Sequence, residues 1–281
     1  MRAFRAIHSH PDGPFPALLG AVTALSNLMV TYSIECAEVE GNTMNGLWEH
    51  AIGIATAFAA VVVFDLPLRA FFSASKTRWF ALHSLVNIAI SAMCLLDLVG
   101  VIRAPLCAMV EPTSSWFPSY AAFSLHLYHL TCFTALRLED IVHHVLFAGG
   151  LGVFNFAIAW GRMTNLLIFF MTGLPGAIDY GMLVFVKTGK LKRLTQKSIT
   201  SSINTWLRAP GHVFTATIMA ICTWHHMTGA VPYPAAVVGA VASLCLLNGI
   251  YYGEQAVGSY HKMAALSPLY AAKQAGMNGS C

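Results

Sequence analysis

Long apolar stretches separated by short polar ones dominate the chain. A membrane-spanning helix requires about 20 mostly apolar residues. Stretches of this kind lie at residues 16–34, 50–72, 79–102, 117–137, 141–160, 163–187, 211–229 and 233–253. One separator is long, and residues 188–210 are expected to be a polar segment between two spans. The pattern predicts an all-α, polytopic transmembrane bundle of about eight spans, and seven spans are the alternative if the first stretch lies differently.

Composition supports a membrane location. Of the 281 residues, 57% are hydrophobic and only 10% are charged, and the mean hydropathy is +0.63. Soluble domains are about 25% charged. The chain therefore has too few charged side chains to cover a soluble fold, which excludes an ordinary cytosolic enzyme, a disordered protein and a nucleic-acid-binding protein.

Basic residues orient the predicted spans, because cytoplasmic loops carry an excess of Lys and Arg. With a cytosolic N-terminus and eight spans, 14 of the 16 basic residues fall on the cytosolic side, and only Arg103 and Arg162 fall on the other. We therefore expect a cytosolic segment at 1–15, a single transmembrane domain at 16–253 and a cytosolic tail at 254–281.

Ionisable residues inside spans are costly and are candidates for function. The segment Leu138-Glu139-Asp140-Ile-Val-His143-His144 begins the fifth span and places each acid one helical turn before a histidine. A carboxylate in that position can orient an imidazole as a general base for a hydroxyl or an amine. The alternative is that Glu139 and Asp140 cap the helix N-terminus while neighbouring helices satisfy both histidines.

Other polar residues fall in the same, cytosolic half of the predicted bundle, among them His83, His129 and Asp179. Asp179 follows Gly173-Leu174-Pro175-Gly176, where Pro175 removes a backbone hydrogen bond and kinks the sixth span. A broken helix beside a carboxylate is typical of a substrate cavity or an ion path. The alternative is a kink that serves packing alone.

Metal chemistry is not expected. The pairs His126/His129, His143/His144 and His225/His226 place too few ligands on one side of the membrane for a di-metal centre. The seven cysteines show no metal-type spacing, and nothing in their placement requires a disulfide.

Residues 79–253 resemble the TLC domain, which translocating-chain-associating membrane proteins and ceramide synthases share. The resemblance rests on Glu139-Asp140-x-x-His143-His144, followed by Asn155, Arg162 and Asp179. It implies that His143 and His144 are acyl-transfer histidines in a protein of the endoplasmic reticulum or another intracellular membrane. The family's His-Asp pair would fall near Phe170-Met171, and neither residue is present, so the chain resembles a divergent member that is not a ceramide synthase.

These observations predict a membrane protein of lipid metabolism or lipid binding. Acyl transfer from acyl-CoA would use His143, His144, Asp140 and Asp179, with the lipid contacted by His83, His129, Glu139, Asn155 and Pro175. No cofactor is expected besides an acyl-CoA substrate or a bound lipid. The alternatives are lipid binding without catalysis, an accessory subunit with protein partners in the bilayer, and a transporter or channel with a broken sixth helix.

Overall fold

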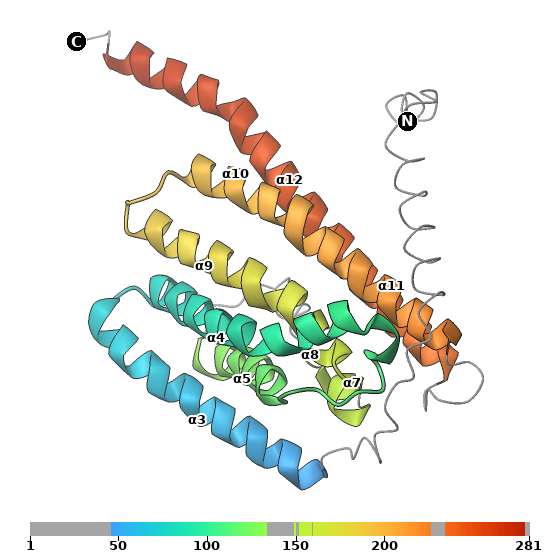
Figure 1. Ribbon diagram of the computed structural model, residues 1–281. Coiled ribbons are helices and arrows are strands. Elements are labelled where there is room, and N and C mark those ends of the chain that lie inside the picture. Colours follow the sequence, from blue (N-terminus) through green and yellow to red (C-terminus); the bar gives the residue numbers. More distant parts are fainter. Residues whose placement is uncertain (1–45, 134–148, 150–151, 159, 226–233, 279–281) are drawn as a thin grey trace, which may run out of the picture. The chain divides into compact units, whose positions relative to one another are not determined.

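The computed structural model describes residues 46–133, 149, 152–158, 160–225 and 234–278. All of them belong to the second of the chain's two units, residues 38–281. This part of the chain is helical and contains no strand, which confirms the predicted all-α class (Figure 1). Its main helices are α3 (Leu47–Phe71), α4 (Ser75–Arg103), α5 (Phe117–Cys132), α7 (Gly152–Ala157), α8 (Met163–Ile168), α9 (Leu174–Lys187), α10 (Arg193–Ile203), α11 (Ala209–His225) and α12 (Ala235–Asn278).

Among the described residues, four helical stretches are long and apolar enough to cross a membrane. They are Leu47–Phe71, Ser75–Arg103, Met163–Lys187 and Ala235–Ser267. The predicted count of about eight spans is not confirmed. Helices α5 and α11 lie where spans are predicted but have only 16 and 17 residues, and the predicted spans at 16–34 and over most of 141–160 lie outside the described residues.

The outward faces of these helices are apolar. On α3, Val63 and Phe64 are 62% and 54% exposed, and on α12 Leu247 and Ile250 are 60% and 63% exposed. A helix that is apolar both inside and outside is typical of a membrane span, where lipid chains cover the outer face. The exposed leucines and phenylalanines therefore support a bilayer as the surroundings of this fold.

Helix α4 lies at the centre of the packing. It contacts α3 and α5, and it also contacts α8 and α9. Large buried side chains fill the core around it, including Leu82 and Ile90 of α4, Leu125 and Tyr128 of α5, and Phe169. Because α4 contacts both groups of helices, it positions α5 and α9 relative to each other.

A buried carboxylate joins three elements near one end of α4. Asp65 of α3 is fully buried and accepts hydrogen bonds from Arg69 Nε at 2.9 Å and from Tyr128 Oη of α5 at 2.7 Å. Arg78 Nε, in the first turn of α4, lies 3.2 Å from the other carboxylate oxygen. A charge with this many partners is a structural ion pair that holds α3, α4 and α5 together.

A second buried carboxylate organises the connection between α4 and α5. Asp97 is 1% exposed and accepts hydrogen bonds from the Thr113 hydroxyl at 2.8 Å, the Ser114 backbone at 3.0 Å and Asn165 Nδ2 of α8 at 2.6 Å. Cys107, in the turn after α4, is disulfide-bonded, which the cysteine spacing did not predict.

The segment predicted as a polar separator is helical over most of its length. Helix α10 continues through the π-helical segment η5 (Asn204–Arg208) into α11. It packs against α9 and α12, and Figure 1 shows α12 running alongside α10 and α11. Helix α12 itself extends to Asn278, well beyond residue 253, where the last span was predicted to end.

Candidate functional site

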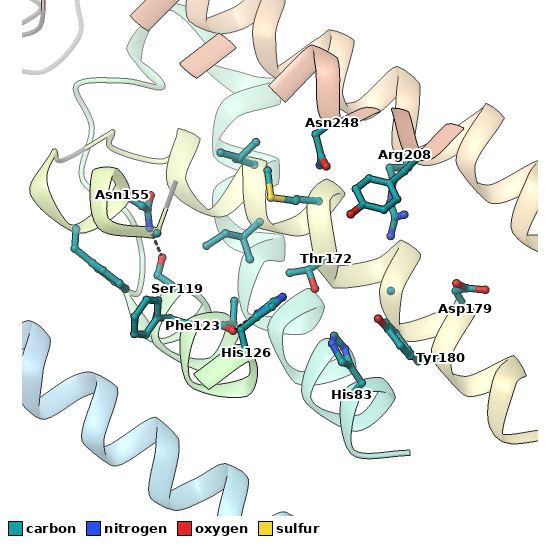
Figure 2. Close-up of a pocket in the computed structure, with 18 residues that line it drawn as sticks. His83, Ser119, Phe123, His126, Asn155, Thr172, Asp179, Tyr180, Arg208 and Asn248 are labelled. Carbon is teal, nitrogen blue, oxygen red and sulfur yellow. Dashed lines mark hydrogen bonds between the residues drawn. The ribbon is translucent and has the colours of Figure 1, made fainter. Parts of the chain in front are cut away.

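A cavity of about 250 Å³ lies among the helices of this unit (Figure 2). Side chains from α4, α5, α7, α8, α9, α12 and the two π-helical segments line it. The lining residues are His83, Ser119, Ala122, Phe123, His126, Gly152, Asn155, Phe156, Leu167, Ile168, Met171, Thr172, Gly176, Asp179, Tyr180, Arg208, Asn248 and Tyr252.

One wall of the cavity is shaped by a π-helical turn, η4 (Phe169–Gly173), between α8 and α9. The N–H of Leu174 bonds to the carbonyl of Phe169, five residues back, and Pro175 follows with no N–H to donate. Single π turns inside helices occur frequently at functional sites. Here the turn places Met171 and Thr172 in the lining. The sixth predicted span is therefore distorted rather than broken.

Close contact between α9 and α4 orients a histidine. A Cβ on Gly176 would lie 2.6 Å from Asn87 Nδ2, so only glycine lets the two helices approach this closely. Asn87 accepts a hydrogen bond from the Thr172 hydroxyl at 3.1 Å, and its Nδ2 lies 3.0 Å from His83 Nδ1. The His83 ring also stacks on Tyr180, with 3.9 Å between the ring centroids. These contacts fix the position of His83 in the lining.

The Asp179 carboxylate is held by α10. Its Oδ1 accepts hydrogen bonds from Gln196 Nε2 at 2.9 Å and from the Thr200 hydroxyl. Gln196 and Thr200 are 1% and 6% exposed, so these bonds form in a buried environment. A carboxylate that accepts two buried hydrogen bonds keeps one orientation at the edge of the cavity.

Arg208 brings a positive charge to the cavity from η5. Its Nη1 donates to Asn204 Oδ1 at 3.2 Å, and its guanidinium lies 5.9 Å from the centre of the Tyr252 ring. The Nε–H is buried and has no hydrogen-bond partner. Within the described residues no carboxylate forms a direct ion pair with the guanidinium, although the negative charge of Asp179 acts on it through space.

Asn248 of α12 is the second polar group with an unused atom. It is 3% exposed, and its Nδ2 lies 3.4 Å from His212 Nε2. Its Oδ1 is buried and accepts no hydrogen bond. Figure 2 shows Asn248 and Arg208 together on one side of the cavity, across from Ser119, Phe123 and His126.

The wall formed by α5, α7 and α8 is mostly apolar. Phe123, Phe156, Leu167 and Ile168 line it. The polar residues of this wall are occupied with each other or with the backbone: Asn155 Nδ2 donates to the Ser119 hydroxyl at 2.9 Å, and His126 Nδ1 lies 2.7 Å from its own helix's Ala122 carbonyl. The cavity therefore has one apolar side and one polar side.

The residues predicted from the sequence divide into three groups. His83, Asn155 and Asp179 line the cavity. Pro175 is buried beside Gly176 at the start of α9, whereas His129 stacks on Trp79 at 3.8 Å and is not in the lining. Of the predicted catalytic residues only Asp179 is described, and His143, His144 and Asp140 lie outside the described part of the chain, as does Glu139, a predicted lipid contact.

Sequence reasoning missed Arg208 and Asn248. A usable signal was present for Arg208, because Gln196, Thr200, Asn204, Arg208 and His212 recur every four residues and form one polar stripe on a helix. The segment was interpreted as a separator between two spans because it is polar. No comparable pattern marks Asn248 in its apolar helix.

In the described residues no group of three His, Cys, Asp or Glu side chains is placed to hold a metal ion. Comparison with protein-family models, curated proteins and solved structures finds no match to this chain. Its function has to be argued from the cavity itself.

Proposed function

We propose that this chain is a multi-pass membrane protein that binds an amphipathic, lipid-type ligand in the cavity of Figure 2. One observation carries the proposal: a single cavity has an apolar wall from α5, α7 and α8 and a polar side with Asp179, Arg208 and Asn248. Such a division matches a molecule with an acyl chain and a polar head.

The apolar wall accounts for the chain of the ligand. Burying one CH₂ group contributes about 0.8 kcal/mol when it leaves water. A lipid drawn from the bilayer gains much less from apolar burial, because its chain already lies in hydrocarbon. The polar side of the cavity must then supply most of the selectivity.

Acyl transfer stays a prediction. Its proposed base and orienting acid, His143 and Asp140, lie outside the described residues, as do His144 and Glu139. The likeness to the TLC domain also stays a prediction, because the comparisons bear on neither fold family nor activity. Lipid binding needs only the residues that line the cavity.

The orientation in the membrane is part of the proposal. Charge placement puts Arg103 and the turn after α4 on the side away from the cytosol. Disulfides persist in oxidising compartments and are rare in the cytosol. The disulfide-bonded Cys107 lies in the same turn, so a second, independent feature favours a turn after α4 that lies away from the cytosol.

Native mass spectrometry of the full chain in mild detergent tests lipid binding. We expect a lipid to remain bound to the wild-type chain. Leu167→Trp fills the apolar side of the cavity and is expected to lose the bound lipid. Leu127→Trp on α5 is the matched control, because Leu127 is 37% exposed and absent from the lining.

Two results would count against the proposal. One is a wild-type chain that carries no lipid. The other is equal lipid retention by Leu167→Trp and Leu127→Trp, which would place the lipid on the outer surface. Recovery only with a fixed protein partner would favour an accessory subunit instead.

A further inference from the structure

The polar side of the cavity contains two buried atoms with opposite hydrogen-bonding needs. Arg208 Nε–H is a donor without an acceptor, and Asn248 Oδ1 is an acceptor without a donor. Most buried polar atoms in proteins have a partner, so each exception requires an explanation. Both residues line the same cavity, which makes a bound molecule the simplest explanation.

The donor is also charged. A guanidinium in a membrane protein is costly unless it is paired. Among the described residues the direct partners of Arg208, Asn204 and Tyr252, are neutral, and the Asp179 carboxylate acts on it without a direct ion pair. Arginine presents a planar set of donors that matches the oxygens of a carboxylate or a phosphate. A group that accepts a hydrogen bond from Arg208 Nε–H is therefore expected to be an oxyanion.

The unpaired acceptor atom on the polar side restricts the chemistry of the head group further. Asn248 Oδ1 requires a donor, and an oxyanion that is fully ionised has none to offer. A head group that carries both an oxyanion and a hydroxyl satisfies Arg208 and Asn248 together. A single acyl chain of such a molecule then lies against Phe123 and Leu167 on the apolar side.

Asp179 shares the cavity and its negative charge opposes an anion. Its Oδ1 already accepts hydrogen bonds from Gln196 and Thr200 of α10, which satisfy that oxygen. Arg208 Nε, by contrast, has no partner. The anion is therefore expected at Arg208 and Asn248 rather than beside Asp179.

We infer that the cavity binds a single-chain lipid whose oxyanion is held by Arg208 and whose hydroxyl donates to Asn248. This inference rests on the proposed lipid binding and specifies the head group. A carboxylate and a phosphate share the chemistry that Arg208 recognises, and the probes below include one of each.

Three probes added to the full chain in nanodiscs of neutral lipid test the inference. Oleoyl lysophosphatidic acid carries a phosphate and a hydroxyl, oleate carries only a carboxylate, and monooleoylglycerol carries hydroxyls without charge. We expect affinity to fall in that order. If oleate binds as tightly as the lysophospholipid, the hydroxyl contact to Asn248 is wrong.

Variants at position 208 test whether Arg208 causes the preference for anionic probes. Because a hydrogen bond to a charged group contributes strongly to binding, Arg208→Gln is expected to lower the affinity for both anionic probes about 10- to 100-fold. The affinity for monooleoylglycerol is expected to stay the same. Arg208→Lys keeps the charge without the Nε–H, and its affinity for the anionic probes is expected to lie between those of the wild-type chain and Arg208→Gln. Arg193→Gln is the matched control, because Arg193 is exposed at the start of α10.

The outcomes separate the two proposals. If none of the three probes binds, lipid binding in this cavity is wrong. If monooleoylglycerol binds as tightly as the anions, or if Arg208→Gln leaves oleate binding unchanged, lipid binding stands and the oxyanion assignment is overturned. The order of the three affinities is measured on the wild-type chain, so it tests the oxyanion assignment even if Arg208→Gln does not fold.

Discussion

Single polar side chains inside this bundle have two different roles, and their hydrogen bonds distinguish them. Asp65 and Asp97 are almost fully buried, and each is held by partners from other elements. Arg208 and Asn248 each leave an atom unused in a cavity. Residues of the first kind stabilise the fold, and residues of the second kind are those to which we assign the proposed ligand contacts.

Asp65→Asn tests the structural role. The change leaves the nearby Arg69 and Arg78 without their carboxylate. Because Arg69 is half exposed, water compensates part of the loss, and we expect about 2–3 kcal/mol of lost stability. Thermal unfolding in detergent measures it. Glu254→Gln, which changes an exposed carboxylate of α12, is the control and is expected to stay within about 0.5 kcal/mol.

Gly161→Ala tests a turn next to α8. Gly161 has a φ of +57°, and a Cβ there would lie 2.5 Å from the Glu111 carbonyl oxygen. We expect a loss of at least about 1–2 kcal/mol, since both the backbone conformation and the contact oppose a side chain. Gly239→Ala in α12 meets nothing within 4 Å and is expected to be neutral or stabilising. Equal unfolding temperatures for the two variants would contradict this account of the turn.

At the residue scale the sequence could identify candidates but not roles. His83 and Asp179 were selected as candidates because they are ionisable residues within apolar stretches, in the cytosolic half of the predicted bundle. The same reasoning included His129, which stacks on Trp79 instead. Whether a polar residue in a span faces a cavity or a neighbouring ring depends on helix rotation, which an evenly apolar helix does not encode.

At the scale of elements, two π-helical segments, η4 and η5, contribute to the same cavity. A π turn inserts one extra residue into a helix and redirects the side chains that follow. In η4 it brings Met171 and Thr172 into the lining, and in η5 it does so for Arg208. The cavity therefore depends on irregular backbone within otherwise regular helices.

Pro175→Ala tests the turn in η4. Alanine restores the N–H that proline lacks, so the carbonyl of Met171 regains a donor and the regular helix becomes more favourable. We expect stability to be kept or raised and lipid retention to fall, because Met171 and Thr172 shift out of the lining. Paired measurements of unfolding temperature and bound lipid check this. Unchanged lipid retention would show that the cavity does not need the π turn.

The predicted elements show where sequence patterns suffice. Apolar length predicted α3, α4 and the stretch from α8 to α9 close to their observed bounds. The α10 segment was missed because its polar residues point inward. Gln196, Thr200 and Asn204 are buried against neighbouring helices. A polar face normally signals water, and only packing reveals that this one faces protein.

At the scale of the whole molecule, the orientation in the membrane is the property most open to test. Both charge placement and the Cys107 disulfide favour a turn after α4 that lies away from the cytosol. The turn between α9 and α10 carries Lys190 and Lys192, so it is expected on the cytosolic side.

Cysteine labelling in sealed vesicles checks this topology. Lys190→Cys and Pro112→Cys place exposed thiols in the two turns. Cys132, which is exposed, is replaced by serine, and this background chain without an added cysteine is labelled in parallel as the control. We expect an impermeant maleimide on the cytosolic face to modify Lys190→Cys and not Pro112→Cys. The opposite labelling would invert the topology, and equal labelling would show an error in the number of spans.

The inward polar stripe of α10 and η5 also has a consequence for how the protein is made. Asn248 and Tyr252 belong to α12, which is synthesised after α10 and η5, yet they complete the surroundings of Arg208. Until α12 is synthesised, α9 covers Gln196 and Thr200, but the Arg208 guanidinium lacks its neighbours Asn248 and Tyr252. A chain that lacks α12 would thus expose a polar helix surface inside the membrane. Membrane quality control recognises unassembled intermediates by features of this kind.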